Sequence, residues 1–279
     1  MTCEVKIIQD SINPYNDIRL TTLQVRYWRA IHAELMTHRV FSRNASSSRA
    51  IPISTILKQV WNDPAGPIHW GANQSGMKAW VELTGIKKKF AQFMWRFIGK
   101  IVCILVWITN KLVSPHKQIF NRILEPWSYI SVIITSTEWA NFFELRDHPD
   151  AQPEIQELAR MMKIAMDASR PESIAQGEWH LPYITSEEKT IYSQEELLKA
   201  STARCARVSY SNHDGSIPNI AKDIDLHDKL VGSEPRHSSP AEHQATPGEP
   251  DYWYKNFKGW IQYRVYIEDE NDIYNKRRK

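Results

Sequence analysis

The chain has 279 residues, 42% of them hydrophobic, and a formal net charge of +3. This length allows one large domain or two small ones with a substantial core, and so mild a charge is not that of a dedicated nucleic-acid binder. The cysteines Cys3, Cys103 and Cys205 form no paired spacing, which disfavours a disulfide framework or a zinc ribbon and favours reduced thiols in a cytoplasmic protein. The first residues show no signal-peptide pattern, and no His-Glu-x-x-His spacing occurs, so no metal site is expected.

Hydrophobic periodicity predicts a mixture of helices and strands without an internal repeat. Strands are expected at 5–9, 19–27 and 129–134. A helix over 28–37 is expected to lead His38 and Arg39 into a polar loop, with Glu34 and His38 on one helix face. Other helices are expected at 78–112, 150–168, 195–206, 220–230 and 256–267, and one more should end near Arg146. Loops are expected around 61–77 and 237–252.

The most apolar run of the chain is 97–108. It contains Lys100 and is followed by Asn110 and Lys111, so it is too short and too interrupted to span a bilayer. We expect a buried helix here. The helix at 150–168 should also pack on a core, because its apolar residues fall on one stripe: Ile155, Leu158, Met162 and Met166.

The segment 37–49 is too polar to be core. It holds three arginines, one histidine, one asparagine and four serines around only two large apolar side chains. Guanidinium groups are planar, permanently charged donors that suit phosphate, and the short polar side chains add further hydrogen bonds. The segment therefore predicts contact with a phosphorylated small molecule or a nucleic-acid backbone, unless it is only a solvated loop.

The order of residues in this segment resembles the signature of the flavin-dependent thymidylate synthases, an Arg-His-Arg element followed after seven residues by Ser. Thr37-His38-Arg39 is followed after seven residues by Ser47, with Asn44 and Arg49 in register. Thr37 replaces the usual first Arg, and Ala45 replaces the usual Glu.

Two further blocks resemble the same family. One block covers 116–159 and includes Asn141-Phe142-Phe143-Glu144-Leu145-Arg146 and Ala151-Gln152-Pro153-Glu154-Ile155. The other comprises Ala206-Arg207-Val208-Ser209-Tyr210 and Ser238-Ser239-Pro240-Ala241-Glu242-His243. In ordinary members this last block precedes the Arg-His-Arg element, so the resemblance implies a permuted order of blocks.

The resemblance implies one α/β domain over 1–279, with a mixed or antiparallel sheet, flanking helices and no Rossmann unit, like the thymidylate synthase-complementing proteins. The helical part around 61–115 would be an insertion, and the family's usual N-terminal segment would lie at about 195–267. The implied reaction is reductive methylation of dUMP to dTMP with FAD, with methylenetetrahydrofolate and NADPH as co-substrates. It also implies a cytoplasmic homotetramer with active sites shared between subunits, no membrane and no dedicated nucleic-acid partner.

The resemblance also assigns roles to individual residues. Arg146 is the candidate catalytic residue, since a fixed guanidinium stabilises negative charge that develops on the pyrimidine ring. Glu34 stands where the family has a nucleotide-contacting Gln, although its carboxylate would repel phosphate. The implied dUMP-binding set is Glu34, Ser47, Ser48, Arg49, Arg122 and Arg146. The implied FAD-binding set is Thr37, His38, Arg39, Asn141, Ser209, Ser239 and Glu242.

Two other functions remain open from the sequence. A related enzyme could use the same flavin and pyrimidine nucleotide but transfer a different one-carbon group. Alternatively, Arg39, Arg43 and Arg49 could grip a nucleic-acid backbone, in which case polynucleotide binding would depend steeply on salt and no chromophore would be bound.

Overall fold

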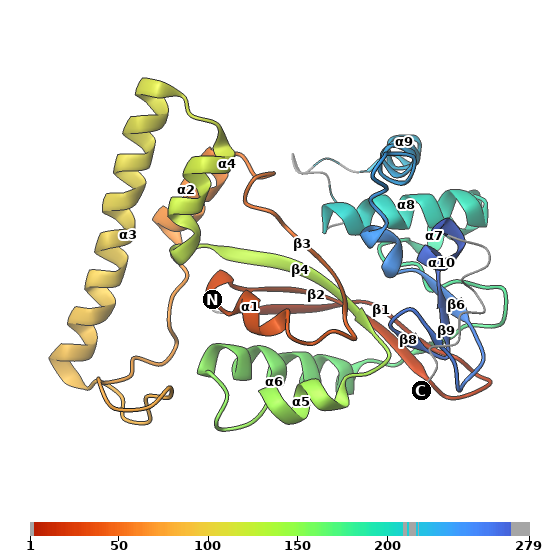
Figure 1. Ribbon diagram of the computed structural model, residues 1–279, viewed down its shortest axis with the longest axis horizontal. Helices are drawn as coiled ribbons and strands as arrows, with labels where there is room; N and C mark the ends of the chain where they lie inside the picture. Colours follow the sequence, from red (N-terminus) through yellow and green to blue (C-terminus); the bar gives the residue numbers. More distant parts are fainter. Residues whose placement is uncertain (1–2, 209–210, 212–215, 217, 269–279) are drawn as a thin grey trace.

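The computed structural model describes residues 3–208, 211, 216 and 218–268. A five-stranded sheet forms its centre, with the strand order β3-β4-β2-β1-β5 (Figure 1). The strands are β1 (Glu4–Ile12), β2 (Arg19–Trp28), β3 (Ser42–Ala45), β4 (Tyr129–Ser136) and β5 (Glu172–Ser173). Only the β1–β5 pair is parallel, so the sheet is mixed. The expected α/β class, with a mixed sheet and flanking helices rather than a Rossmann unit, is confirmed.

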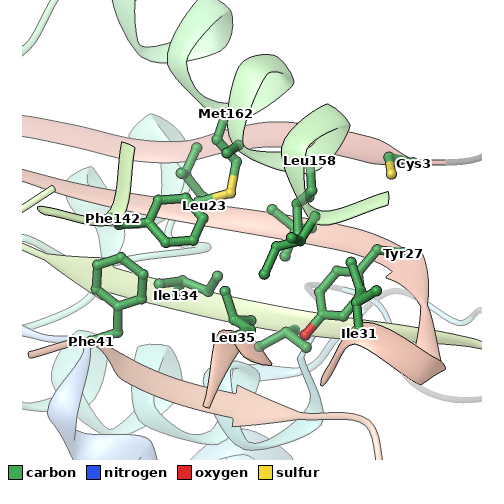
Figure 2. Packing of buried hydrophobic residues seen from close by; sticks show 14 of the residues in the cluster. Cys3, Leu23, Tyr27, Ile31, Leu35, Phe41, Ile134, Phe142, Leu158 and Met162 are labelled. Carbon is green, nitrogen blue, oxygen red and sulfur yellow. The ribbon is translucent and has the colours of Figure 1, made fainter. Parts of the chain in front are cut away.

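One face of the sheet carries the largest core. Alternate residues of β2 and β4, among them Leu23 and Ile134, point to this face because side chains alternate across a strand. It is covered by α1 (His32–Leu35), α5 (Ala140–Arg146) and α6 (Pro153–Ala168) (Figure 1). Figure 2 shows Leu158 and Met162 of α6 above the strands, with Phe41 and Phe142 beside them. The stripe predicted for α6 is buried, as expected.

The other face of the sheet is covered by the C-terminal part of the chain. Ile133 of β4 packs there against Cys205 of α8 (Gln194–Arg207), together with Tyr183 and Val208. The remaining elements of this half are α7 (Ser186–Ile191), α9 (Ile220–Val231), η3 (Ser239–Glu242), β6 (Ala245–Pro247), β7 (Trp253–Tyr254), β8 (Phe257–Lys258), β9 (Trp260–Gln262) and α10 (Tyr263–Glu268). The helix expected over 256–267 is therefore wrong for most of its length, because Gly259 takes a left-handed conformation between two short strands.

The helix expected over 28–37 is also shorter in the structure. A 3₁₀ turn, η1 (Arg29–Ile31), leads into the four residues of α1, and the chain then turns toward β3. The hydrogen bond from the Thr37 hydroxyl to the Glu34 carbonyl closes this turn. The short helix still leaves Glu34 and His38 close to each other in space, as the site below shows.

The segment 46–128 forms a helical arm beside the sheet. It contains α2 (Ile53–Asn62), α3 (Gly85–Val113), α4 (Lys117–Phe120) and η2 (Asn121–Trp127). One side of α3 packs on α2 and η2 through Gly99, Cys103 and Val106, and Trp127 lies so close to Gly99 that a side chain there would crowd it. Figure 1 shows α3 at the outer edge of the molecule, away from the sheet.

The opposite side of α3 is exposed and apolar. The exposed stripe comprises Ile86, Phe90, Phe93, Phe97, Ile101, Ile104, Leu105, Ile108 and Leu112. The expectation of a buried helix at 97–108 is therefore wrong, because this helix is apolar on two sides and the chain covers only one. By length and composition, α3 is the one helix in the described part of the chain that could cross a membrane, with 17% of its most apolar window buried.

Candidate functional site

A cluster of polar side chains surrounds Arg146 at the last turn of α5. Its Nη1 donates to Glu34 Oε2 at 2.8 Å, its Nε donates to His38 Nε2 at 3.1 Å, and its Nη2 donates to Thr37 Oγ1 at 3.2 Å. Arg146 and His38 are 108 residues apart in sequence. The fold thus brings together four residues that the sequence assigned to the site, and it takes them from two separate blocks.

His38 is a neutral imidazole in this cluster. Its side chain lies edge-on to Phe142 with ring centroids 4.9 Å apart, and the residue is 6% exposed. Burial, with the positive charges of Arg146 and Arg43, lowers the pKa of His38 to about 4. Because its Nε2 accepts from Arg146, the ring proton lies on Nδ1. His32 bonds the Tyr27 hydroxyl at 2.7 Å and His69 bonds the Ala79 carbonyl, which gives both rings structural partners.

A cavity of about 700 Å³ opens beside Glu34 and Arg146. Its walls come from three places: Trp28 at the end of β2, the segment 67–79 of the helical arm, and the segment 150–154 before α6. The main-chain N of Ile68 donates to Glu154 Oε1 at 2.9 Å, which ties the second wall to the third. This volume lies within the range of small-molecule sites. The loop-rich segment around 61–77 therefore contributes to the cavity and not only to the surface.

The second group of predicted nucleotide ligands lies at the turn after β3. Ser48 is buried and its hydroxyl donates to Glu125 Oε1 at 2.7 Å, whereas Ser47 and Arg49 are exposed. The guanidinium of Arg122 lies 4.0 Å from the same Glu125 carboxylate, and the Arg122 side chain is 61% exposed. This ion pair therefore constrains Arg122 only weakly. None of the predicted phosphate-binding residues at 47–49 and 122 lines the Arg146 cavity.

The third group of predicted residues lies around η3, on the opposite face of the sheet. Ser239 is exposed, while Glu242 pairs with Arg264 and lies near Arg43 of β3. Burial lowers the pKa of Arg43, and the Glu242 charge opposes that shift. Ser209 lies outside the described residues. Arg39 and Asn141 are both exposed near the Arg146 cluster, Arg39 just after His38 and Asn141 in the first turn of α5.

A chain of buried hydrogen bonds lies on the face of the sheet opposite the Arg146 cluster. It links Ser11 to His180, His180 to Thr22 and Thr22 to Thr135, each at 2.7 Å, and Thr135 to His243 at 2.8 Å. The Asn44 amide nitrogen faces His243 Nε2 at 3.2 Å and the Ser239 carbonyl at 3.1 Å. In this orientation every bond has one donor and one acceptor, with a proton on Nδ1 of each histidine. The chain thus holds η3 against the edge strand β3.

Sequence reasoning missed this buried chain. The signal that could have found it is the presence of Thr22 and Thr135 in two strands that each carry a run of apolar residues. Buried hydroxyls need partners, and two threonines at equivalent depth in neighbouring strands can pair across the sheet.

The two buried imidazoles of this chain should make the protein acid-sensitive. Burial lowers the pKa of His180 and of His243 to about 3, whereas an unfolded chain titrates near 6.5. Between these values the unfolded state binds protons that the native state does not, so the free energy of unfolding should fall as pH falls. The expected loss approaches about 1.4 kcal/mol per pH unit for each imidazole.

Urea unfolding at pH 7, 6 and 5 measures this effect. The variant His148→Gln is the control, since it replaces an exposed histidine that lies outside the buried chain. A free energy of unfolding that stays constant from pH 7 to pH 5 would contradict the assignment.

The residues present suit a nucleotide cofactor better than a metal. In the described part of the chain no group of three or more His, Cys, Asp or Glu side chains could hold a metal ion. Arg39 and Arg49 are exposed and have no acidic partner among the described residues, so their guanidinium groups are available to phosphate oxygens. Asn141 adds an exposed amide donor in the first turn of α5. Exposed guanidinium and amide donors of this kind suit the phosphate groups of a nucleotide or of a dinucleotide such as FAD.

Comparison with known proteins gives remote structural similarity only. No protein-family model matches the sequence, and no curated protein is significantly similar to it. The UMP/dUMP methylase PolB from Streptomyces cacaoi, bound with 5-Br UMP, is 16% identical over 58% of this chain and 88% of its own, with a TM-score of 0.44. Thymidylate Synthase X from Helicobacter pylori, with FAD and dUMP, is 14% identical over 53% of this chain and 67% of its own, with a TM-score of 0.36.

Proposed function

We propose that the protein is a flavin-dependent pyrimidine-nucleotide methylase of the thymidylate synthase type. The single observation that carries this proposal is the convergence on Arg146 of Glu34, Thr37 and His38, which come from a different sequence block. Two of these residues, Glu34 and Arg146, line a cavity large enough for a nucleotide. The proposed reaction is reductive methylation of a pyrimidine nucleotide such as dUMP, with methylenetetrahydrofolate as carbon donor and NADPH as reductant.

In this proposal the protein binds, orients and polarises its substrate. Arg146 donates to the pyrimidine ring, where its charge stabilises the negative charge that develops as C5 becomes nucleophilic. His38 accepts from Arg146 Nε and so fixes the plane of the guanidinium. FAD, held by His38, Arg39, Asn141, Ser209, Ser239 and Glu242, would supply the redox chemistry. Ser47, Arg49 and Arg122 would bind the nucleotide phosphate.

We infer that the order of blocks is permuted in one domain, with the family's first segment at about 195–267. This inference is supported by the contacts between η3 and β3. The Asn44 amide reaches the Ser239 carbonyl, and Arg43 lies near Glu242, although about two hundred residues separate the partners. The 195–267 segment therefore packs beside the polar segment that follows β2, although it comes after that segment in sequence.

We propose further that the active protein is a homotetramer that assembles through the exposed stripe of α3. The stripe from Ile86 to Leu112 extends about 39 Å at the helical rise of 1.5 Å per residue, and its apolar side chains gain by leaving water. The exposed Ser47, Arg49 and Arg122 lie outside the Arg146 cavity of their own chain. A second copy would let them complete that cavity, which is what shared active sites require.

If the exposed stripe of α3 forms the subunit interface, a charge placed in it should change the oligomeric state. Ile104→Asp places a charge in the middle of the stripe, where the side chain is 45% exposed, and should convert the tetramer to smaller species. Size-exclusion chromatography with light scattering measures the mass. Ile191→Asp is the matched control, because Ile191 is 70% exposed at the end of α7 and lies away from α3. A monomeric wild type, or an Ile104→Asp protein of unchanged mass, would contradict the assembly.

The visible absorbance spectrum of the purified, dialysed protein tests the function. We expect flavin bands that bleach when NADPH is added in the presence of a pyrimidine nucleotide. A methylated nucleotide should then form when methylenetetrahydrofolate is supplied, as detected by chromatography and mass spectrometry. A colourless protein that neither binds added FAD nor oxidises NADPH would overturn the proposal, and salt-sensitive polynucleotide binding would then favour the nucleic-acid alternative.

A further inference from the structure

The ion pair between Glu34 and Arg146 presents a defined set of donors and acceptors to the cavity. Glu34 Oε2 accepts from Arg146 at 2.8 Å, while Oε1 of the same carboxylate has no hydrogen-bond partner among the described residues. Arg146 uses one N–H for each of Glu34, Thr37 and His38. Since a guanidinium has five N–H groups, two remain. The pair therefore offers one free acceptor oxygen beside two free donors.

The charges around the cavity favour the base of a nucleotide over its phosphate. Asp150 and Glu154 line the cavity together with Glu34, whereas Arg146 and Lys78 are its cations. A phosphate would meet these carboxylates, and the carboxylate of Glu34 already balances the guanidinium. The exposed arginines outside the cavity are better suited to phosphate. A neutral ring therefore suits the Glu34–Arg146 pair better than a phosphate does.

The two pyrimidines differ at the edge that this pair would meet. Cytosine has an amino donor at position 4 beside two acceptors, N3 and O2. Uracil has an acceptor, O4, at position 4 and a donor at N3. A carboxylate only accepts, so it is repelled by uracil O4 and can bond uracil only by accepting from N3–H, with the guanidinium then donating to O2. Next to cytosine it accepts from the amino group while the guanidinium donates to N3 and O2.

We propose that Glu34 makes this site selective for a cytosine nucleotide, such as dCMP, over the uracil nucleotide. The inference rests on the proposed function and names the substrate class of the same site. Glu34 acts as a specificity-determining residue through its acceptor-only carboxylate. A glutamine at this position offers a donor as well as an acceptor, and so can bond O4 of uracil while it still accepts from Arg146.

Binding measurements on the full-length protein with FAD test the proposal. Isothermal titration with dCMP and with dUMP should give a dissociation constant for dCMP that is lower by about tenfold or more, the order expected for one good bidentate contact to a base edge. In Glu34→Gln, which keeps size and an acceptor for Arg146, the preference should reverse toward dUMP. Asp150→Asn is the matched control, since it removes a charge from the same cavity wall and should preserve the wild-type ratio.

Each other outcome has a distinct meaning. A wild type that binds dUMP as well as or better than dCMP overturns the selectivity but leaves the methylase proposal standing. A shift in Asp150→Asn as large as in Glu34→Gln also overturns it, because the effect would then be one of net charge. A folded protein that binds neither nucleotide overturns both proposals.

Discussion

Replacing Arg146 with lysine is expected to lower the rate of nucleotide methylation by on the order of a hundredfold or more. Lysine keeps the positive charge but loses the planar fork that reaches Glu34, Thr37 and His38 at once. The lysine ammonium can reach fewer of these partners, so its charge is no longer held in line with the ring. Single-turnover formation of methylated nucleotide in the FAD-loaded protein measures the loss.

Flavin content and thermal stability serve as the reference readouts for this variant. Both should stay close to wild type, because the Arg146 side chain is 21% exposed and is not part of the hydrophobic core. Arg160→Lys is the matched control, since Arg160 lies on α6 with a side chain 54% exposed and pairs with Asp147 at 3.6 Å. Retained turnover in Arg146→Lys would remove the guanidinium from the mechanism.

The second large effect concerns stability and the buried Arg204 of α8. Its Nε donates to Asp223 Oδ2 at 2.9 Å, its Nη2 donates to Glu188 Oε1 at 2.6 Å, and its Nη1 donates to the Tyr183 carbonyl at 2.8 Å. Burial acts to raise the pKa of Glu188, but hydrogen bonds from Arg204 and Thr185 outweigh burial and hold that pKa below its ordinary value. Arg204 is thus the one partner that both carboxylates share, while Asp223 also pairs with Arg207 at 2.7 Å and Glu188 also accepts from Thr185.

Arg204→Met should lower the free energy of unfolding by about 3–5 kcal/mol, since it removes the fully buried guanidinium that Asp223 and Glu188 share. Urea denaturation at pH 7 followed by circular dichroism measures the change. Lys229→Met is the matched control, because this exposed pair with Asp225 on α9 should change stability by less than about 1 kcal/mol. An equal effect in the two variants would refute the role given to Arg204.

The sheet and several helices could be predicted from sequence because each buries one face. Alternation in β2 and β4 and the helical stripe of α6 are local patterns, and the structure follows them within a few residues. The short η1–α1 turn and the strands β8 and β9 could not be predicted in this way. Their conformations depend on contacts with β3, β6 and Ile18, which are distant in sequence.

The candidate site was predictable only in its residue types. Motif order indicated Arg146 and His38, but it carried no information that the two side chains would meet. It also could not indicate that the Ser48 hydroxyl is occupied by Glu125, since that contact spans 77 residues. Nor could it indicate that Glu34 pairs with Arg146. Which side chains pair across a fold is determined by tertiary packing. Tertiary packing depends on many distant residues together, so a local motif does not reveal it.

Because Ile134 and Thr135 are neighbours in β4, insertions and deletions of single residues in this strand should be disruptive. Ile134 belongs to the core under α5 and α6, and Thr135 belongs to the buried hydrogen-bond chain on the opposite face. Inserting or deleting one codon in this strand would move the hydroxyl into the hydrophobic core and would place the isoleucine between Thr22 and His243. Surviving length variants should therefore add or remove residues in β4 only in pairs, whereas exposed loops away from the candidate site can vary by single residues.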